Sequence, residues 1–203
     1  VVGGTIDVAA ADAVQDITAY DSGASDYDIQ DSAGALLSSV GQEAVVNSGV
    51  DTVFVTDSSV DADTGAQLNA LELSLEDVGG TDIDFTVTDT AGAVASELSA
   101  TGDELNEAND VNVVGGTIDV AAADAVQDIT RYDAAASGYV IEDSAGSVLG
   151  DTGTILDSGV AHVDVNSIAS ANVGVALGGL EDALEAGYSS DISFTVSDDA
   201  SAI

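Results

Sequence analysis

Short segments of strict hydrophobic and polar alternation recur along the chain. In residues 82–88 the apolar side chains of Ile83, Phe85 and Val87 alternate with polar ones. A period of two residues predicts a β-strand that buries one face and exposes the other. The same alternation returns in residues 192–197. We therefore expect strands with one covered face and one face in water.

Each predicted strand opens a phrase that recurs at short intervals. Four phrases begin at Gly3, Asp26, Asp51 and Asp82, and four more begin at Gly115, Gly138, Ala161 and Asp191. After most strands the chain continues with Asp, then Ser or Thr, then an Ala-rich run, in which the carboxylate can cap the first amides of a helix. The repeated unit is thus predicted to be a strand, a capped turn and a helix.

The predicted helices differ in strength. The strongest spans residues 65–78, with Leu68, Leu71 and Leu75 on one face and Gly79-Gly80 at its end, and residues 175–186 play the same part later. Weaker helices, interrupted by Gly and Ser, are expected at residues 12–17, 33–37 and 90–98.

A longer repeat contains these units. Residues 1–18 and 113–130 have the same sequence, so the long period is 112 residues and each short unit averages 28 residues. We divide the chain into a first long repeat, residues 1–112, with four strand-helix units, and a second, incomplete one, residues 113–203. A chain that starts without Met and stops partway through a repeat is expected to be part of a longer array.

The order of strand and helix predicts the fold. Strands joined by helices at short intervals pair in parallel through right-handed crossovers. The polar outward residues Asp84, Thr86 and Thr88 are unlike the continuous apolar strands of a sheet covered on both faces. We therefore predict an α/β fold, a right-handed parallel β-α solenoid with about 28 residues per coil. The alternative is a series of tandem immunoglobulin-like β-sandwiches, whose domains have a length close to the long period.

Comparison of the two long repeats predicts the core. Four apolar pairs keep their character in both copies, namely Tyr27 and Ile29, Val53 and Val55, Tyr139 and Ile141, and Val163 and Val165. By contrast, Phe54 is replaced by Asp164 in the second copy. We expect the retained pairs to be buried and Phe54 to lie on the outer face.

Charge limits the partners that the chain can have. Thirty-eight acidic residues stand against one basic residue, Arg131, which gives a formal net charge of −37. Such a surface repels nucleic acid and anionic membranes, and the chain has no apolar run long enough to span a bilayer. The 45% hydrophobic content nevertheless favours a folded protein. We expect the fold to require cations that screen or bind the carboxylates.

Catalytic chemistry has few candidates. His162, Asp164 and Ser167 can be written as a Ser-His-Asp set, but no glycine elbow precedes the serine, and the matching position in the first copy is Thr52. Without Cys, neither a disulfide framework nor a thiol nucleophile is possible. We therefore expect no enzyme activity and a solvated surface histidine.

Calcium is the only cofactor that the sequence suggests. Asp57, Asp61, Asp63 and Glu72 faintly resemble a helix-loop-helix calcium loop, although Gly65 is one position too early for that motif. The acids at the predicted strand ends, Asp31, Asp57, Asp89, Asp143 and Asp198, would form a ladder of like charges in a parallel stack. Such a ladder needs bound cations or capping hydrogen bonds. We favour an arrangement in which each Asp caps the helix that follows it in the chain.

The phrase V-T-D-T-A at residues 87–91 returns as I-Q-D-S-A, I-E-D-S-A and V-S-D-D-A. In these phrases the chain resembles giant repetitive acidic bacterial cell-surface proteins, such as adhesins and surface-layer-like repeat proteins. The resemblance implies a secreted structural protein, often stabilised by calcium, with no catalytic residues.

Two functions follow as expectations. The first is a structural repeat segment of an extracellular filament, surface layer or adhesin stalk, whose partners are copies of itself or adjoining repeats of the same chain. The alternative is an adhesin module at the cell surface that recognises a glycan or a partner, with Phe54, Arg131 and His162 marking the recognition face.

Overall fold

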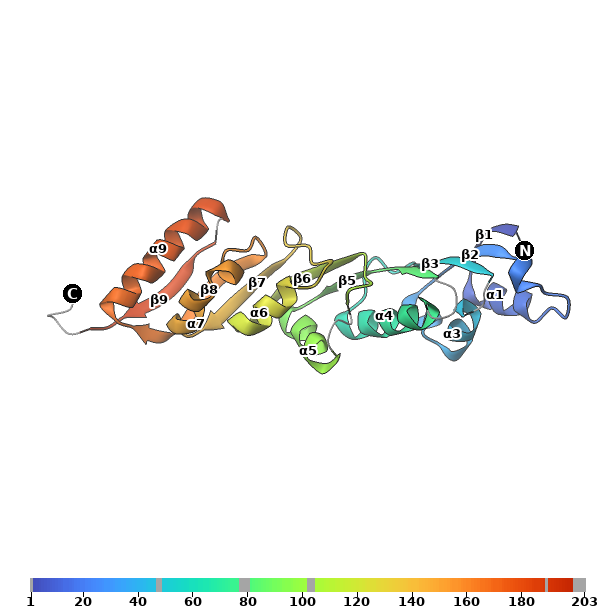
Figure 1. The fold of residues 1–203 in the computed structure, drawn as a ribbon, viewed down its shortest axis with the longest axis horizontal. Helices are drawn as coiled ribbons and strands as arrows, with labels where there is room; N and C mark the ends of the chain where they lie inside the picture. Colours follow the sequence, from blue (N-terminus) through green and yellow to red (C-terminus); the bar gives the residue numbers. More distant parts are fainter. Residues whose placement is uncertain (1, 47–48, 77–80, 102–104, 189, 199–203) are drawn as a thin grey trace. The chain divides into compact units, whose positions relative to one another are not determined.

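The computed structural model describes residues 2–46, 49–76, 81–101, 105–188 and 190–198. The chain forms two compact units. The first unit contains Val1–Thr88 and Thr101–Val111, and the second contains Asp89–Ala100 and Asn112–Ile203. Each unit combines parallel strands with helices (Figure 1), so the predicted α/β class is confirmed.

Every predicted strand phrase contains a strand. The strands are β1 (Val2–Ile6), β2 (Asp26–Asp31), β3 (Val50–Val55), β4 (Asp82–Asp84), β5 (Thr86–Asp89), β6 (Asp110–Ile118), β7 (Gly138–Asp143), β8 (Val160–Ala169) and β9 (Ile192–Val196). The fourth phrase is not one strand, because it divides at Phe85 into β4 and β5. These two strands belong to different sheets, a division that the unbroken alternation of the sequence does not predict.

The strands form two sheets, with the orders β1-β2-β3-β4 and β5-β6-β7-β8-β9. The pairs β1-β2, β2-β3, β3-β4, β6-β7, β7-β8 and β8-β9 are all parallel. Immunoglobulin-like sandwiches are built from antiparallel sheets. That alternative is therefore wrong for the described part of the chain.

The parallel register aligns the same core positions in both units. Ile6, Ile29, Val53 and Ile83 are successive partners across β1 to β4, and Ile118, Ile141, Val163 and Ile192 are successive partners across β6 to β9. The predicted core residues Tyr27, Ile29, Val53, Tyr139, Ile141 and Val163 are all buried. Val55 and Val165 are only half-buried, so the prediction was wrong for these two. Val55 is the last residue of β3, where the chain leaves the sheet.

The outward face of the strands is open to solvent, as the alternation predicts. Asp84, Thr86 and Thr88 are partly exposed, and Phe54 is also partly exposed. In register, Phe54 lies between Gln30 and Asp84 on the neighbouring strands. The polar positions therefore remain in contact with water while the apolar ladder is covered.

The helices cover the apolar positions of the strands. They are α1 (Val8–Gln15), α2 (Ala33–Leu36), α3 (Ser39–Val45), α4 (Ala62–Glu76), α5 (Ala91–Thr101), α6 (Val120–Gln127), α7 (Ala145–Gly150), α8 (Thr152–Ile155) and α9 (Ala171–Gly187), with a short 3-10 helix at Ser22–Ala24. Both strong helices, α4 and α9, begin earlier than predicted. Asp61 sets the start of α4, because its carboxylate accepts the Thr64 N–H at 2.8 Å.

Helix α3 was missed by the sequence prediction. It begins after Ser38, whose hydroxyl accepts the Gly41 N–H at 3.0 Å. A Cβ atom at Gly41 would lie 2.1 Å from the carbonyl oxygen of Ala35, so glycine permits the close packing of α3 on α2. Glycine has a low helix propensity, but close packing requires it at this position, so propensity alone did not predict α3.

Candidate functional site

Carboxylates at the strand ends connect neighbouring repeats. Asp31 is the last residue of β2, the strand that comes after α1. Its Oδ2 accepts the N–H of Val8, the first residue of α1, at 3.2 Å. Asp57 accepts the N–H of Ala33, the first residue of α2, at 2.7 Å. Each of these acids therefore caps the helix of the preceding repeat. The sequence predicted instead that each Asp caps the helix that follows it in the chain, and this was wrong for this set.

The second unit repeats this cross-repeat cap. Asp143 accepts the Val120 N–H at 3.2 Å, and Asp198 accepts the Ala171 N–H at 2.9 Å. At the position of Asp57, the second unit has Ser167, whose hydroxyl accepts the Ala145 N–H at 2.9 Å. A neutral acceptor can therefore take the place of the carboxylate.

The helix that follows each strand receives its cap from the next residue in the chain. Ser32 accepts the Ala35 N–H at 3.3 Å, and Ser144 accepts the Ser147 N–H at 3.2 Å. The Asp-Ser dipeptide thus serves two helices, one in each of two successive repeats. The carboxylates that the sequence placed in a charge ladder accept hydrogen bonds from helix N-termini at these positions. The partial positive charge of a helix N-terminus stabilises an anion.

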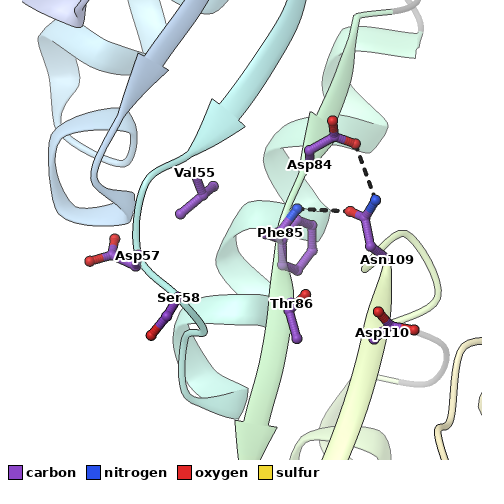
Figure 2. A pocket seen from close by; sticks show the side chains of 8 residues that line it. All are labelled: Val55, Asp57, Ser58, Asp84, Phe85, Thr86, Asn109 and Asp110. Atoms are coloured by element: carbon purple, nitrogen blue, oxygen red, sulfur yellow. Dashed lines mark hydrogen bonds between the residues drawn. The ribbon is translucent and has the colours of Figure 1, made fainter.

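A shallow surface pocket of about 340 Å³ lies in the first unit. Its lining residues are Val55, Asp57, Ser58, Asp84, Phe85, Thr86, Asn109 and Asp110 (Figure 2). Three of them carry carboxylates and none carries a positive charge, so the pocket favours cations over anions. The pocket lies where the chain leaves β3 after Val55, before Val60 pairs again with Val87.

Asn109 fixes one wall of this pocket. Its side-chain oxygen accepts the Phe85 N–H at 2.9 Å, and its side-chain nitrogen donates to Asp84 at 3.2 Å (Figure 2). The backbone N–H of Asn109 also donates to the Phe85 carbonyl at 2.8 Å. The Asn109 amide therefore provides the hydrogen bonds that a strand would make at the point where β4 and β5 separate.

The four predicted calcium ligands have different roles in the structure. Asp57 lines the pocket and caps α2, while Asp61 caps α4 and has a pKa lowered by hydrogen bonds from the Thr64 side chain and backbone. Asp63 accepts a hydrogen bond from the Gln67 amide at 2.9 Å, and Glu72 is buried in α4. Within the described ranges, no three His, Cys, Asp or Glu residues are grouped to hold a metal ion. Calcium binding stays a prediction.

His162 lies between two carboxylates on the outward face of β8. Its Nδ1 is 2.5 Å from Asp191 Oδ1, and its Nε2 is 3.0 Å from Asp164 Oδ1 and 3.1 Å from Ser193 Oγ. Burial by itself lowers the pKa of His162, but the hydrogen bonds to Asp191 and Asp164 outweigh burial and raise it. The histidine is therefore partly buried and hydrogen-bonded between two carboxylates, and is not the freely solvated surface residue that the sequence predicted.

The two carboxylates favour the protonated form of His162. Ionised carboxylates only accept hydrogen bonds, so the ring donates to both Asp191 and Asp164 only when it carries a proton on each nitrogen. In that doubly protonated form the ring has no lone pair with which to take a proton from Ser193, whereas the neutral ring has one. Ser167, the serine that the sequence suggested, caps α7 instead. The alternation pattern could have indicated Ser193, because it places Ser193 and His162 on the same outward face of neighbouring strands.

No helix among the described residues is long and apolar enough to cross a membrane. The described residues of this chain are distinguished by a repeated set of cross-repeat caps, an acidic surface pocket and a histidine hydrogen-bonded between two carboxylates. A comparison with known protein families, curated proteins and solved structures finds no match for this chain.

Proposed function

We propose that this chain is a non-enzymatic structural repeat segment of an extracellular filament, surface layer or adhesin stalk. The observation that carries the proposal is the recurrence of one register in both units. Tyr27 pairs with Val50 as Tyr139 pairs with Val160. A chain that reproduces the same packing and the same caps in successive units can be lengthened by adding further repeats, as in spacer and fibre proteins.

The finer fold belongs to the same proposal, a right-handed parallel β-α solenoid with about 28 residues per coil. Parallel pairing of consecutive strands within each sheet supports it. Contacts of α1 with α3, α6 with α8, and α7 with α9 also support it, because successive helices of a solenoid pack side by side. Cross-repeat caps by Asp31, Asp57, Asp143 and Asp198 then join each coil to the one before it.

Cations complete the proposal. A net charge of −37 produces repulsion in the folded state that dissolved or bound cations reduce. The pocket with Asp57, Asp84 and Asp110 is where we expect a divalent cation such as Ca2+ to gather. An extracellular or cell-surface location, where salt or calcium is abundant, fits this requirement. The expected partners are copies of the chain or adjoining repeats.

Thermal unfolding tests the cation dependence. The midpoint is measured at low ionic strength, with calcium chloride, with calcium and excess chelator, and with sodium chloride at the ionic strength of the calcium sample. We expect cations to raise the midpoint, and calcium to raise it more than sodium at equal ionic strength. An unchanged midpoint in all four samples would reject the dependence.

Electron microscopy of the native material tests the structural role. The proposal predicts fibres, sheets or stalks with a regular repeat along their length. Monodisperse particles under cation-rich conditions would contradict it.

A binding module is the second candidate, and the pocket is the observation that favours it. Phe85 and the Asn109 amide line a hollow that is also accessible to polar groups such as sugar hydroxyls (Figure 2). Screening of the whole chain on a glycan array tests this function. Binding that is lost in Asn109→Ala, but kept in a variant outside the pocket such as Asp51→Ala, would favour recognition over a purely structural role.

A further inference from the structure

An apolar surface of the second unit has a buried counterpart in the first. Val87 and Phe85 are 0% and 4% exposed in the first unit. The residues at the same positions of the second unit are Val196, which is 43% exposed, and Phe194, which is partly exposed. The equivalence is shown by the adjoining helix, where Gly65 packs against Val87 and Phe85 as Gly174 packs against Val196 and Phe194.

Residues 105–111, which we term the junction segment, cover this surface in the first unit. Leu105, Ala108 and Val111 of the junction segment are fully buried. A Cβ atom at Gly65 would lie 3.3 Å from the Leu105 side chain, as well as 2.5 Å from Val87. The Leu105 side chain therefore packs where Val87 of β5 meets Gly65 of α4.

Hydrogen bonds fix the position of the junction segment. Its Asn109 N–H donates to the carbonyl of Phe85 at 2.8 Å, and the Glu107 N–H donates to the side-chain oxygen of Asn69 at 3.0 Å. Asn69 is 1% exposed and belongs to α4. Phe85, between β4 and β5, and Asn69 of α4 thus both bind the backbone of this segment.

The corresponding surface of the second unit is open. Among the described residues, the three atoms nearest to a Cβ at Gly174 all belong to Val196 and Phe194, whereas Leu105 is among the nearest at Gly65. Val175 is 78% exposed, whereas Ala66, at the same position of α4, is 6% exposed. In the described part of the chain, β9 pairs with β8 and stands at one end of the sheet order, so one edge of its backbone is available for pairing.

We propose that Val175, Phe194 and Val196, with the open edge of β9, bind the junction segment of an adjoining repeat. We term these residues the terminal surface. The partner is a segment with the apolar spacing of Leu105, Ala108 and Val111, which turns at residues 105–107 and enters a strand at Asp110. It would occupy the place beside Gly174 that Leu105 occupies beside Gly65. This inference rests on the proposed function and identifies the contact by which one repeat adds to the next. Main-chain pairing at the strand edge supplies affinity, and the apolar side chains supply specificity.

A peptide with the sequence of residues 105–114 tests the proposal on the whole chain. It is titrated into isotopically labelled protein, and amide NMR shifts are followed. Because Glu107 and Asp110 add negative charge to an acidic surface, the titration is run in about 1 M sodium chloride, where the screening length is about 3 Å. We expect saturable shifts at Gly174, Phe194 and Val196. A scrambled peptide of the same composition should produce none.

Two variants locate the binding site. Val196→Asp and Val175→Asp should each lower the affinity for the peptide at least about tenfold. Val175 is largely exposed on α9, so its substitution keeps the test valid if Val196→Asp impairs folding. Ile17→Asp changes another exposed apolar residue, in the first unit, and should leave the affinity unchanged.

The possible results separate this inference from the proposed function. Absent shifts, or shifts confined to the first unit, overturn the terminal surface whatever microscopy shows. Equal binding of the scrambled peptide also overturns it. Specific binding supports the inference, even if the native material forms no fibres and the filament proposal fails.

Discussion

The carboxylate of Asp57 accepts the backbone N–H of Ala33 at 2.7 Å, although the two residues are 24 positions apart in the chain. Ala33 is the first residue of α2, and its helix is also capped by Ser32 from the same repeat. The start of α2 therefore depends on two successive repeats at once. A contact of this kind couples the folding of neighbouring repeats, because neither can open without releasing a helix N-terminus.

Replacement of Asp57 should weaken this coupling. Asp57→Ala removes the acceptor, and we expect the free energy of unfolding to fall by about 0.5–2 kcal/mol, the usual range for loss of a helix cap. Asp57→Ser should lose less, because Ser167 caps α7 through its hydroxyl in the second unit. Urea unfolding followed by circular dichroism measures both changes.

The control for this experiment is Asp51→Ala. Asp51 is an exposed residue of β3, so its removal changes the net charge equally without removing a cap. If Asp57→Ala and Asp51→Ala unfold at the same urea concentration, the cap does not stabilise the first unit.

Local patterns predicted the elements that depend on local physics. The alternation of Ile83 and Phe85 with polar residues reports burial on one face, and the leucines of α4 report a helix of regular period. Both signals depend only on neighbours in sequence. They predicted the strands, the two long helices and most of the core without knowledge of the stacking.

Contacts between repeats could not be predicted in the same way. The acceptor for Ala33 lies one repeat further along the chain, so only the stacked structure shows that Asp57 reaches it. The division of the strand at Phe85 depends on Asn109, which replaces the strand's own partner groups. The partner of His162 across the sheet, Asp191, likewise depends on the register of β8 and β9.

Glycines at a bulge offer a second test, on matched positions. Gly4 and Gly116 belong to the identical segments of the two copies, with φ of +95° and +88°. A Cβ atom at Gly4 would meet nothing within 4 Å, whereas one at Gly116 would lie 3.2 Å from the backbone nitrogen of Ala91. Gly4→Ala should therefore cost about 1–2 kcal/mol of stability from backbone strain alone. Gly116→Ala should cost more, because crowding against Ala91 is added.

Urea unfolding of the two single variants against the parent chain measures this difference. The prediction concerns the order of the two effects and the presence of a loss in both. A Gly116→Ala variant as stable as the parent would show that the bulge relaxes without cost.

Tyr27 provides a prediction at alkaline pH. Its hydroxyl accepts a hydrogen bond at 2.9 Å from the amide of Gln15, which also donates to the carbonyl of Ala44 at 2.9 Å. Burial raises the pKa of Tyr27 to about 12, above its ordinary value of 10.0. The neutral form is thus favoured in the folded state. Its contribution to stability is complete below pH 10 and is lost as the pH rises toward 12.

Ultraviolet titration of tyrosinate tests this behaviour against Tyr27→Phe. The difference between the two titration curves should show one group that ionises well above pH 10. A difference curve centred near pH 10 would mean that Tyr27 is accessible to water.

Gln15→Ala should also reduce stability, by about 1 kcal/mol, because two hydrogen bonds lose their donor.

His162 supplies the last prediction, at neutral pH. Burial alone would lower its pKa, yet the hydrogen bonds to Asp191 and Asp164 raise the pKa above the ordinary 6.5. The folded state therefore keeps the proton at a pH where the unfolded chain releases it. The resulting stability is fully present below about pH 6.5 and is lost as the pH rises through the folded pKa. Because Asp191 is largely exposed, the effect should be modest, about 0.2–1 kcal/mol, and smaller at high salt.

The variant His162→Thr is the matched control, since Thr52 occupies this position in the first unit. At a pH above the folded pKa of His162, the variant should be as stable as the parent chain. Near pH 6 the variant should be less stable than the parent chain. Urea unfolding across this range, with NMR titration of the single imidazole, measures both quantities. An imidazole that titrates at or below 6.5 would show that the carboxylates do not hold the charge. In that case the neutral ring would be available at Nε2 to accept a proton from Ser193.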